Sequence, residues 1–348
     1  MPPRLSDRLR EYLRATQGRV VNLKDIRAEL KIDPASNAWD TVKALMHNFS
    51  KGEDKLVRPS GLNDGYYKVV TQVKPVKVFV EGRERRPPFK LFFPRGFEAD
   101  AKMDFGEDIV IREGDLVSIG GQSNWGKTTL ALNFCGENIQ YNPILMGNEY
   151  TTRIGDTDEY EPTPRFLNRL DSMDWVQWTN GDGSDAFTLL PVREDYAEHI
   201  VKDRINIIDW VNLDANRLYD ISKVEEDIKA EVGRGIAILV LQKGDGEMAR
   251  GGQFTRDFID LELLIDKFTE KESMLTIGKV KEYNRPVIGR KFAFGIFKGV
   301  KIINFREITK CHVCFGKGWA KAGNTSIPCE ACNKTGYVDK EEILRELK

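Results

Sequence analysis

The sequence lacks long hydrophobic runs, although 41% of its 348 residues are hydrophobic. No stretch reaches the roughly 18 consecutive apolar residues that a membrane-spanning helix needs. The first residues, MPPRLSDRLREYL, also lack the apolar segment of a secretory signal. We therefore expect a globular, cytoplasmic protein with a buried core and, at this length, more than one domain.

The chain also has almost no net charge, because 53 Lys and Arg residues face 54 Asp and Glu residues. The charge is nevertheless uneven along the chain. Residues 1–75 contain 14 basic and 9 acidic residues, a net charge of +5. An excess of this sign fits contact with nucleic acid without establishing it.

Cysteine is scarce, and four of the five cysteines form two CxxC pairs separated by 14 residues. So few thiols suit a reducing compartment, where thiolates bind metal more readily than they form disulfides. Four thiolates complete a tetrahedral Zn²⁺ site and leave no open position for catalysis, so a structural zinc is expected. The alternatives are a redox dithiol pair or an iron–sulfur site. The predicted ligands are Cys311, Cys314, Cys329 and Cys332, whereas Cys135 is expected in the core.

The glycines in CHVCFGKGW and CEACNKTGY resemble those in the CxxCxGxG repeats of DnaJ-type zinc modules. Only two repeats are present, and Lys334 stands where the second repeat would have glycine, so the resemblance implies a single zinc. His312 is expected to be exposed rather than a ligand. Four side chains around the pairs either contact nucleic acid or simply solvate the module: Lys317, Trp319, Lys321 and Lys334.

Residues 1–72 show the periodicity of three short helices followed by a β-hairpin. Asn22 is placed to cap the second helix, and Ser36 or Asn37 the third. This order resembles a winged helix, whose third helix enters the major groove while the hairpin touches the DNA backbone. The resemblance implies that Thr41, Lys43 and His47 on the third helix, with Arg58 and Lys68 on the hairpin, face DNA. Modules of this kind also bind proteins, which leaves the partner open.

The rest of the chain divides by composition. Residues 73–102 are predicted to be a linker with one or two strands, and the cluster Arg83, Arg85 and Arg86 a solvated turn. Residues 103–308 alternate short apolar runs with longer helical segments, which predicts an α/β fold with a mostly parallel sheet. Residues 309–337 form the zinc module, and residues 338–348 a charged helix.

A complete P-loop pattern lies in GDLVSIGGQSNWGKTTLALNF, between a buried strand at 116–119 and a helix that opens at 129. Backbone N–H groups and a helix N-terminus converge on phosphate in such a loop. Lys127 is expected to reach the β- and γ-phosphates of ATP, and the Thr128 hydroxyl to bind Mg²⁺. The alternative is a glycine-rich turn with an exposed lysine. The predicted nucleotide-binding residues are Gly121, Gln122, Ser123, Asn124, Trp125, Gly126, Lys127, Thr128 and Thr129.

Hydrolysis also needs a carboxylate near the metal and a group that activates water. The apolar strand in RINIIDW ends at Asp209, the Walker B position, where the carboxylate would face Thr128 and Mg²⁺. Trp210 follows, where an ATPase of the AAA+ type usually has glutamate. The base must therefore come from elsewhere, and the next apolar run after the P-loop helix ends at Glu149. The alternatives are a strand-capping aspartate and a surface glutamate.

These segments resemble the RecA-like ATPase core of the DnaB-like helicases and RadA-type repair ATPases over residues 103–305. The resemblance implies that Glu149 is the catalytic base and that Gln242, after RGIAILVL, senses the γ-phosphate. It implies a DNA-binding loop in KGDGEMARGGQF, with contacts from Lys243 and Arg250. Lys281 and Arg285, with Lys279 or Arg290 as alternatives, correspond to residues that reach a neighbouring subunit's γ-phosphate.

The resulting expectation is an ATP-dependent, DNA-processing homo-oligomer, a ring or a filament, of the helicase or helicase-related kind, with replication or recombination proteins as partners. A nucleotide-switched DNA-binding regulator and a strand-exchange or repair ATPase that forms filaments remain alternatives. The N-terminal segment resembles a winged helix rather than the helical collar of DnaB-like rings, which leaves ring formation and unwinding open.

Overall fold

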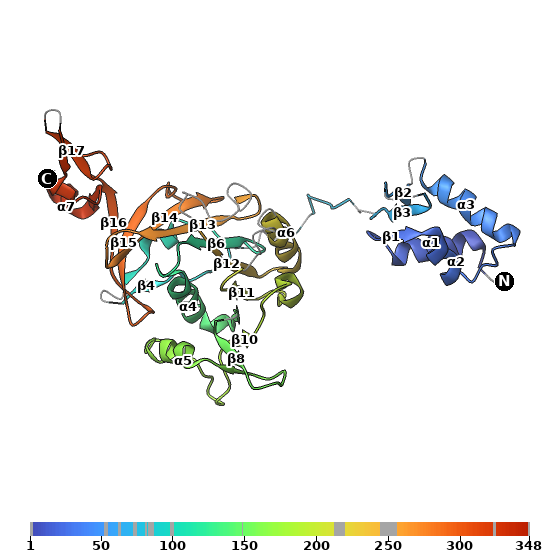
Figure 1. Cartoon of the computed structure of the whole chain (residues 1–348), viewed down its shortest axis with the longest axis horizontal. Helices are drawn as coiled ribbons and strands as arrows, with labels where there is room; N and C mark the ends of the chain where they lie inside the picture. The colour runs from blue at the N-terminus through green and yellow to red at the C-terminus, as the bar shows by residue number, and fades with distance from the viewer. Residues whose placement is uncertain are drawn as a thin grey trace. The chain divides into compact units, whose positions relative to one another are not determined.

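The computed structural model describes residues 3–51, 55–61, 64–71, 75–80, 82, 87–97, 101–147, 149–211, 220–243, 256–322 and 325–346. The chain forms two compact units, Met1–Arg85 and Arg86–Lys348, whose elements are labelled in Figure 1. Within the described ranges, no helix is long and apolar enough to cross a membrane.

The first unit contains three helices and a small antiparallel sheet. The helices are α1 (Leu5–Ala15), α2 (Leu23–Glu29) and α3 (Asn37–Phe49), and the strands β1 (Val20–Asn22), β2 (Val57–Pro59) and β3 (Tyr66–Val69) follow the order β1-β3-β2. The Asn22 side chain accepts a hydrogen bond from the Asp25 N–H at 2.9 Å, which confirms the predicted cap of α2. The helices and the hairpin lie where the periodicity predicts them, and the three-residue strand β1 is an addition.

The second unit is built on a ten-stranded sheet with the order β10-β7-β11-β12-β6-β13-β14-β15-β16-β19. Its first six strands run parallel to one another. They are β6 (Leu116–Gly121), β7 (Ile144–Met146), β10 (Thr188–Leu190), β11 (Ile205–Ile208), β12 (Ile236–Gln242) and β13 (Leu261–Lys267). The prediction of an α/β fold with a mostly parallel sheet is confirmed.

Four antiparallel strands extend the sheet beyond β13. They are β14 (Glu272–Val280), β15 (Lys291–Phe297), β16 (Lys301–Lys310) and β19 (Tyr337–Asp339). Between β16 and β19 lies the cysteine-bearing segment, with the hairpin β17 (Trp319–Ala322) and β18 (Thr325–Pro328) and the 3₁₀ helix η6 (Glu330–Cys332). The helix α7 (Lys340–Glu346) follows β19, in agreement with the predicted charged helix.

Hydrophobic cores lie on both faces of the parallel strands. In β12, Ile236, Ile238 and Val240 belong to the cluster that includes residues of α4 (Lys127–Glu137), while the alternate residues belong to the cluster that includes residues of α6 (Ile221–Glu231). A strand that is buried on both faces is apolar throughout, which explains the continuous hydrophobic runs in the sequence. The predicted core residue Cys135 is fully buried in the α4 cluster.

The remaining elements are short. The two-stranded sheets β4–β5 (Arg95–Gly96, Ala101–Lys102) and β8–β9 (Thr151–Arg153, Tyr160–Pro162) stand apart from the main sheet. The helix α5 (Pro164–Asp171) starts at a Thr163 cap, and 3₁₀ turns occur at η1 (Asp104–Glu107), η2 (Ile139–Tyr141) and η3 (Tyr196–His199).

Candidate nucleotide site and cysteine cluster

The P-loop connects β6 to α4, as the sequence predicts. The strands β6, β7, β11 and β12 are parallel, so their carboxyl ends share one edge of the sheet. This edge is the usual ligand-binding edge of open α/β sheets. It carries the P-loop after β6, Glu149 after β7, Asp209 after β11, and Gln242 as the last residue of β12.

Two P-loop glycines leave no room for a side chain. A Cβ on Gly121 would lie 2.8 Å from the Ile265 carbonyl oxygen, and Gly126 has a φ of +103° that favours glycine. A Cβ on Gly126 would also lie 2.6 Å from the Ile296 side chain. The loop is therefore shaped by its packing against β13 and β15.

Lys127 lies against the loop with its ammonium donating to the Gln122 carbonyl at 2.8 Å. Burial lowers the pKa of Lys127, and the nearby carboxylates of Asp209 and Glu149 oppose this effect. The lysine, the Walker B aspartate and the predicted base thus share one electrostatic environment. Within the predicted set, Thr129 differs from expectation, because its buried hydroxyl donates to the Gly299 carbonyl at 2.9 Å. Only its backbone N–H remains to meet a phosphate.

Asp209 is a buried carboxylate with two hydroxyl partners. Its side chain accepts hydrogen bonds from the Tyr150 hydroxyl and from Thr128. Burial raises the pKa of Asp209, the two hydroxyl donors lower it, and the Glu149 carboxylate raises it further. A divalent cation beside Asp209 and Thr128 would favour the charged carboxylate, so these residues suit a Mg²⁺ site.

Tyr150 also belongs to this site, although no pattern in the sequence indicates it. It is 1% exposed, and burial together with Asp209 raises its pKa well above the usual value. Gly147 makes its position possible, since a Cβ there would lie 2.3 Å from the Asp209 carbonyl oxygen and 2.9 Å from the Tyr150 ring. The sequence GNEY places a glycine and a tyrosine around the predicted base, but this spacing is not a known motif and does not predict the contact between Tyr150 and Asp209.

Glu149 follows β7, and its side chain is exposed. The segment after it is held by the Thr163 hydroxyl, which donates to the Glu149 carbonyl at 3.3 Å, and by the Thr163 N–H, which donates to the Tyr150 carbonyl at 2.8 Å. The Glu149 carboxylate is close enough to raise the pKa of both Lys127 and Asp209, and its role as the base stays a prediction.

Gln242 ends β12 opposite Gly121, and its amide donates to the Ser123 hydroxyl at 3.4 Å. The next residue, Lys243, is buried, with its ammonium 2.5 Å from an Asp266 carboxylate oxygen. Its role as a nucleic-acid contact stays a prediction, and in this conformation the ammonium is committed to Asp266. Arg250 and most of the predicted DNA-binding loop lie outside the described residues, as do Arg83, Arg85 and Arg86.

The candidates for contact with a neighbouring subunit lie at the opposite end of the strands from the P-loop. β13 runs parallel to β6, and the end of β14 pairs with the start of β13. Lys281 is 2.7 Å from an Asp260 carboxylate oxygen. Arg290 pairs with Glu307, and Lys279 donates to the Arg256 carbonyl. The Arg285 side chain is 81% exposed. Of these four cations, Arg285 has the greatest freedom to reach another molecule.

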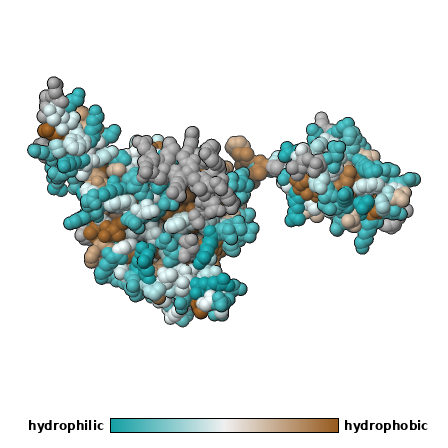
Figure 2. Space-filling model, in the orientation of Figure 1, coloured by the Kyte–Doolittle hydropathy of each residue, from teal (hydrophilic) through white to brown (hydrophobic). Residues whose placement is uncertain are grey.

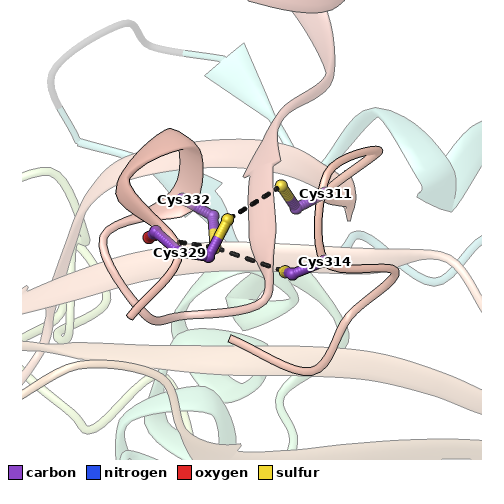
Figure 3. Close-up of side chains that lie close together, drawn as sticks. All are labelled: Cys311, Cys314, Cys329 and Cys332. Atoms are coloured by element: carbon purple, nitrogen blue, oxygen red, sulfur yellow. Dashed lines mark hydrogen bonds between the residues drawn. The ribbon is translucent and has the colours of Figure 1, made fainter. Parts of the chain in front are cut away.

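The four cysteines of the CxxC pairs come together at one point. Figure 3 shows their side chains converging, and the four sulfurs lie within 4.8 Å of one another. Cys311 and Cys329 are 3.8 Å apart, and Cys314 and Cys332 are 3.6 Å apart, measured between sulfurs. A tetrahedral zinc ion with Zn–S bonds of about 2.3 Å holds its sulfurs about 3.8 Å apart. The Gly318 and Gly336 N–H groups donate to the Cys314 and Cys332 sulfurs. The donor set and its spacing therefore fit one zinc.

In the first unit, the predicted contact residues form two groups, and all of them are exposed except Lys68, which is half-buried. Thr41, Lys43 and His47 lie on the exposed face of α3, opposite the buried Val42, Met46 and Phe49. Arg58 and Lys68 are direct cross-strand partners in the hairpin, so their side chains share one face.

No protein-family model matches the chain, and no curated protein matches it. Similar solved structures include a KaiC-like protein from the hyperthermophilic archaeon Pyrococcus horikoshii OT3, which is 18% identical with a TM-score of 0.42 over 62% of this chain and 97% of that one. They also include the RadB recombinase, 15% identical with a TM-score of 0.39 over 55% of this chain and 91% of that one. Likenesses at this level concern the fold alone.

Proposed function

We propose that this chain is a Mg²⁺-dependent ATPase of the RecA-like type that acts on DNA, as a helicase or a helicase-related enzyme. The observation that carries the proposal is the grouping of Lys127, Asp209 and Glu149 at the carboxyl edge of the parallel strands. P-loop lysine, Walker B aspartate and a separate glutamate are the parts that ATP hydrolysis needs.

In the proposed mechanism, the P-loop N–H groups and Lys127 bind the β- and γ-phosphates. Thr128 and Asp209 would hold Mg²⁺, and the bound ion would supply positive charge that offsets the charge of the phosphates. Glu149 orients and deprotonates the attacking water, and Gln242 detects whether the γ-phosphate is present. Arg285 reaches the γ-phosphate of a neighbouring subunit, which requires a homo-oligomer.

The decisive variant is Glu149→Gln, which keeps the size of the side chain and removes its basicity. We expect normal binding of ATP and Mg²⁺ and hydrolysis at least ~100-fold slower, the usual range for loss of a general base. Phosphate release and equilibrium binding of a fluorescent ATP analogue measure the two effects. The matched control is Glu161→Gln, an exposed glutamate on the nearby strand β9.

Hydrolysis close to the wild-type rate in Glu149→Gln would remove Glu149 as the base. A second candidate function would then be favoured, a DNA-binding regulator that is switched by nucleotide. The compact first unit, with Arg58 and Lys68 on one face, supports this candidate. Slow basal turnover together with sequence-specific duplex binding would distinguish it from a DNA-stimulated motor.

The cysteine cluster is proposed to hold one structural zinc. Four cysteine sulfurs at tetrahedral spacing support this assignment. The ion would join two knuckles, the turns that carry Cys311 with Cys314 and Cys329 with Cys332. Only two partly buried hydrophobic residues, Ala320 and Val338, pack against this cluster, so the metal would supply much of what holds the turns together.

A further inference from the structure

Two aromatic side chains of the cysteine module, residues 309–337, are exposed. Phe315 is 76% and Trp319 is 51% exposed. The partly buried hydrophobic residues that pack against the cysteine core are Ala320 and Val338. Figure 2 shows small hydrophobic areas within a largely hydrophilic surface at this end of the unit. Much of each side chain is therefore open to solvent.

Phe315 and Lys334 both have a backbone conformation that is strained for a residue with a side chain. Phe315 has a φ of +54° and Lys334 a φ of +67°, in the left-handed region where glycine is the least strained residue. Lys334 stands two residues after its cysteine pair, at the position that Gly316 occupies after the first pair. A bulky ring and a cation in such positions indicate a use for the side chains, because glycine would make the same turns with less strain.

The two knuckles also bring these residues to one area. A Cβ on Gly318 would lie 2.2 Å from the Lys334 carbonyl oxygen, and one on Gly336 would lie 2.4 Å from the Gly316 carbonyl oxygen. The two turns thus pack backbone against backbone. Lys334 of the second knuckle lies beside the chain that carries Lys317 and Trp319, the two neighbours of Gly318.

The charge of the module is one-sided. Its only acidic residue is Glu330, against four lysines at 310, 317, 321 and 334. Exposed aromatic rings among cations are the elements of single-strand binding, in which unstacked bases lie on the rings and phosphates meet the cations. A duplex, whose bases are already stacked, would use the cations alone.

We propose that the cysteine module binds single-stranded nucleic acid, with bases stacked on Phe315 and Trp319 and phosphates near Lys317, Lys321 and Lys334. This site is separate from the P-loop and goes beyond the proposed ATPase function. Binding there requires neither nucleotide nor hydrolysis.

The test uses the full chain and a fluorescently labelled dT20 oligonucleotide without ATP. We expect Phe315→Ala and Trp319→Ala each to weaken binding about fivefold or more, the usual effect of removing one base–aromatic stack. Trp319→Phe should retain most of the affinity. The matched control is Phe297→Ala, since Phe297 is equally exposed at 51% but lies in β15, outside the module. The zinc content of every variant is measured, so that loss of the fold is recognised.

The lysines are tested by salt dependence. Each phosphate contact on a single strand contributes about 0.7 to the slope of log K against log salt. Lys317→Gln combined with Lys321→Gln should therefore lower the slope by roughly 1.4. Lys127→Ala should leave this binding intact, so failure of the ATPase proposal and failure of this one are distinguishable.

Wild-type affinity for dT20 in both alanine variants with zinc retained would overturn the proposal. An equal loss in Phe297→Ala would also overturn it. A different result would be that Phe315→Ala and Trp319→Ala weaken binding of an unfolded, carboxymethylated polypeptide while binding of dT20 stays unchanged. The surface would then be a protein-docking site, and the proposal would be wrong.

Discussion

At the scale of single residues, the environment of Asp209 depends on Tyr150. The buried tyrosine donates to the carboxylate and opposes the effect of burial on its pKa. A carboxylate in this position has to remain charged to hold a cation. In the proposed ATPase, Tyr150 is therefore a positioning residue, which acts through Asp209 rather than on the nucleotide.

We predict that Tyr150→Phe raises the pKa of Asp209, because a donor to the charged form is lost. Since the charged form is the active one, the acidic limb of the kcat/KM profile should move to higher pH, with activity at pH 6 lower by about tenfold or more. Steady-state ATPase rates between pH 5 and 9 measure this shift. Tyr160→Phe, on the exposed strand β9, is the control, and an unchanged limb in Tyr150→Phe would contradict the role assigned to the hydroxyl.

Glu225 gives a second prediction at this scale, on stability. It is fully buried on α6, and burial, with a contribution from Asp257, raises its pKa to about 8. The folded state therefore binds a proton that the unfolded state releases near its ordinary pKa, so stability falls as pH rises through this window and is level above it. Glu225→Gln should remove this loss.

The free energy of unfolding should be similar in Glu225→Gln and wild type near pH 4.5. The variant should be more stable above pH 8, by an amount on the order of a few kcal/mol. Urea unfolding at several pH values, followed by tryptophan fluorescence, measures the difference. A difference between the two proteins that does not change with pH would contradict the assignment.

At the scale of elements, the sequence predicts the parallel half of the sheet well and the antiparallel half poorly. Strands buried on both faces appear as apolar runs, and the polar residues Asp209 and Gln242 stand out where those runs end. Lys243 is different, because its partner Asp266 lies on β13 and no local pattern reveals the pair. Tyr150 and Gly147 are likewise defined by contacts across the sheet, to Asp209 on the end of β11.

The module between β16 and β19 shows why the cysteines could be identified from spacing alone. The Cys311 N–H donates to the Gly336 carbonyl at 2.8 Å, so the two strands bring the ends of the module together.

We predict one zinc per chain and its loss in Cys329→Ser, with ATP binding unchanged. Elemental analysis after purification under reducing conditions measures the metal. Cys135→Ala, which changes a core cysteine, should retain it, and iron in place of zinc would contradict the prediction.

At the scale of the whole molecule, the first unit is compact by itself, so it can be deleted as a unit to test its proposed role. We predict that deletion of residues 1–72 weakens binding to duplex DNA and leaves ATP binding unchanged. Because phosphate contacts release counterions, the lost component should be the strongly salt-dependent one. Arg58→Ala with Lys68→Ala should reproduce part of the loss, whereas Lys223→Ala on the other unit should not. Equal duplex affinity with and without the unit would point to a protein partner.

The order of the sheet also has a consequence for the synthesis of the chain. β6, which carries the P-loop, lies between β12 and β13, and both neighbours come more than a hundred residues later. At translation rates of about 5–20 residues per second, the roughly 145 residues from the end of β6 to the end of β13 take about 7–30 s to appear. Until β12 has emerged, β6 lies outside the ribosome without either of its partner strands. The nascent chain should therefore depend on chaperones over this stretch, long after the first unit has folded.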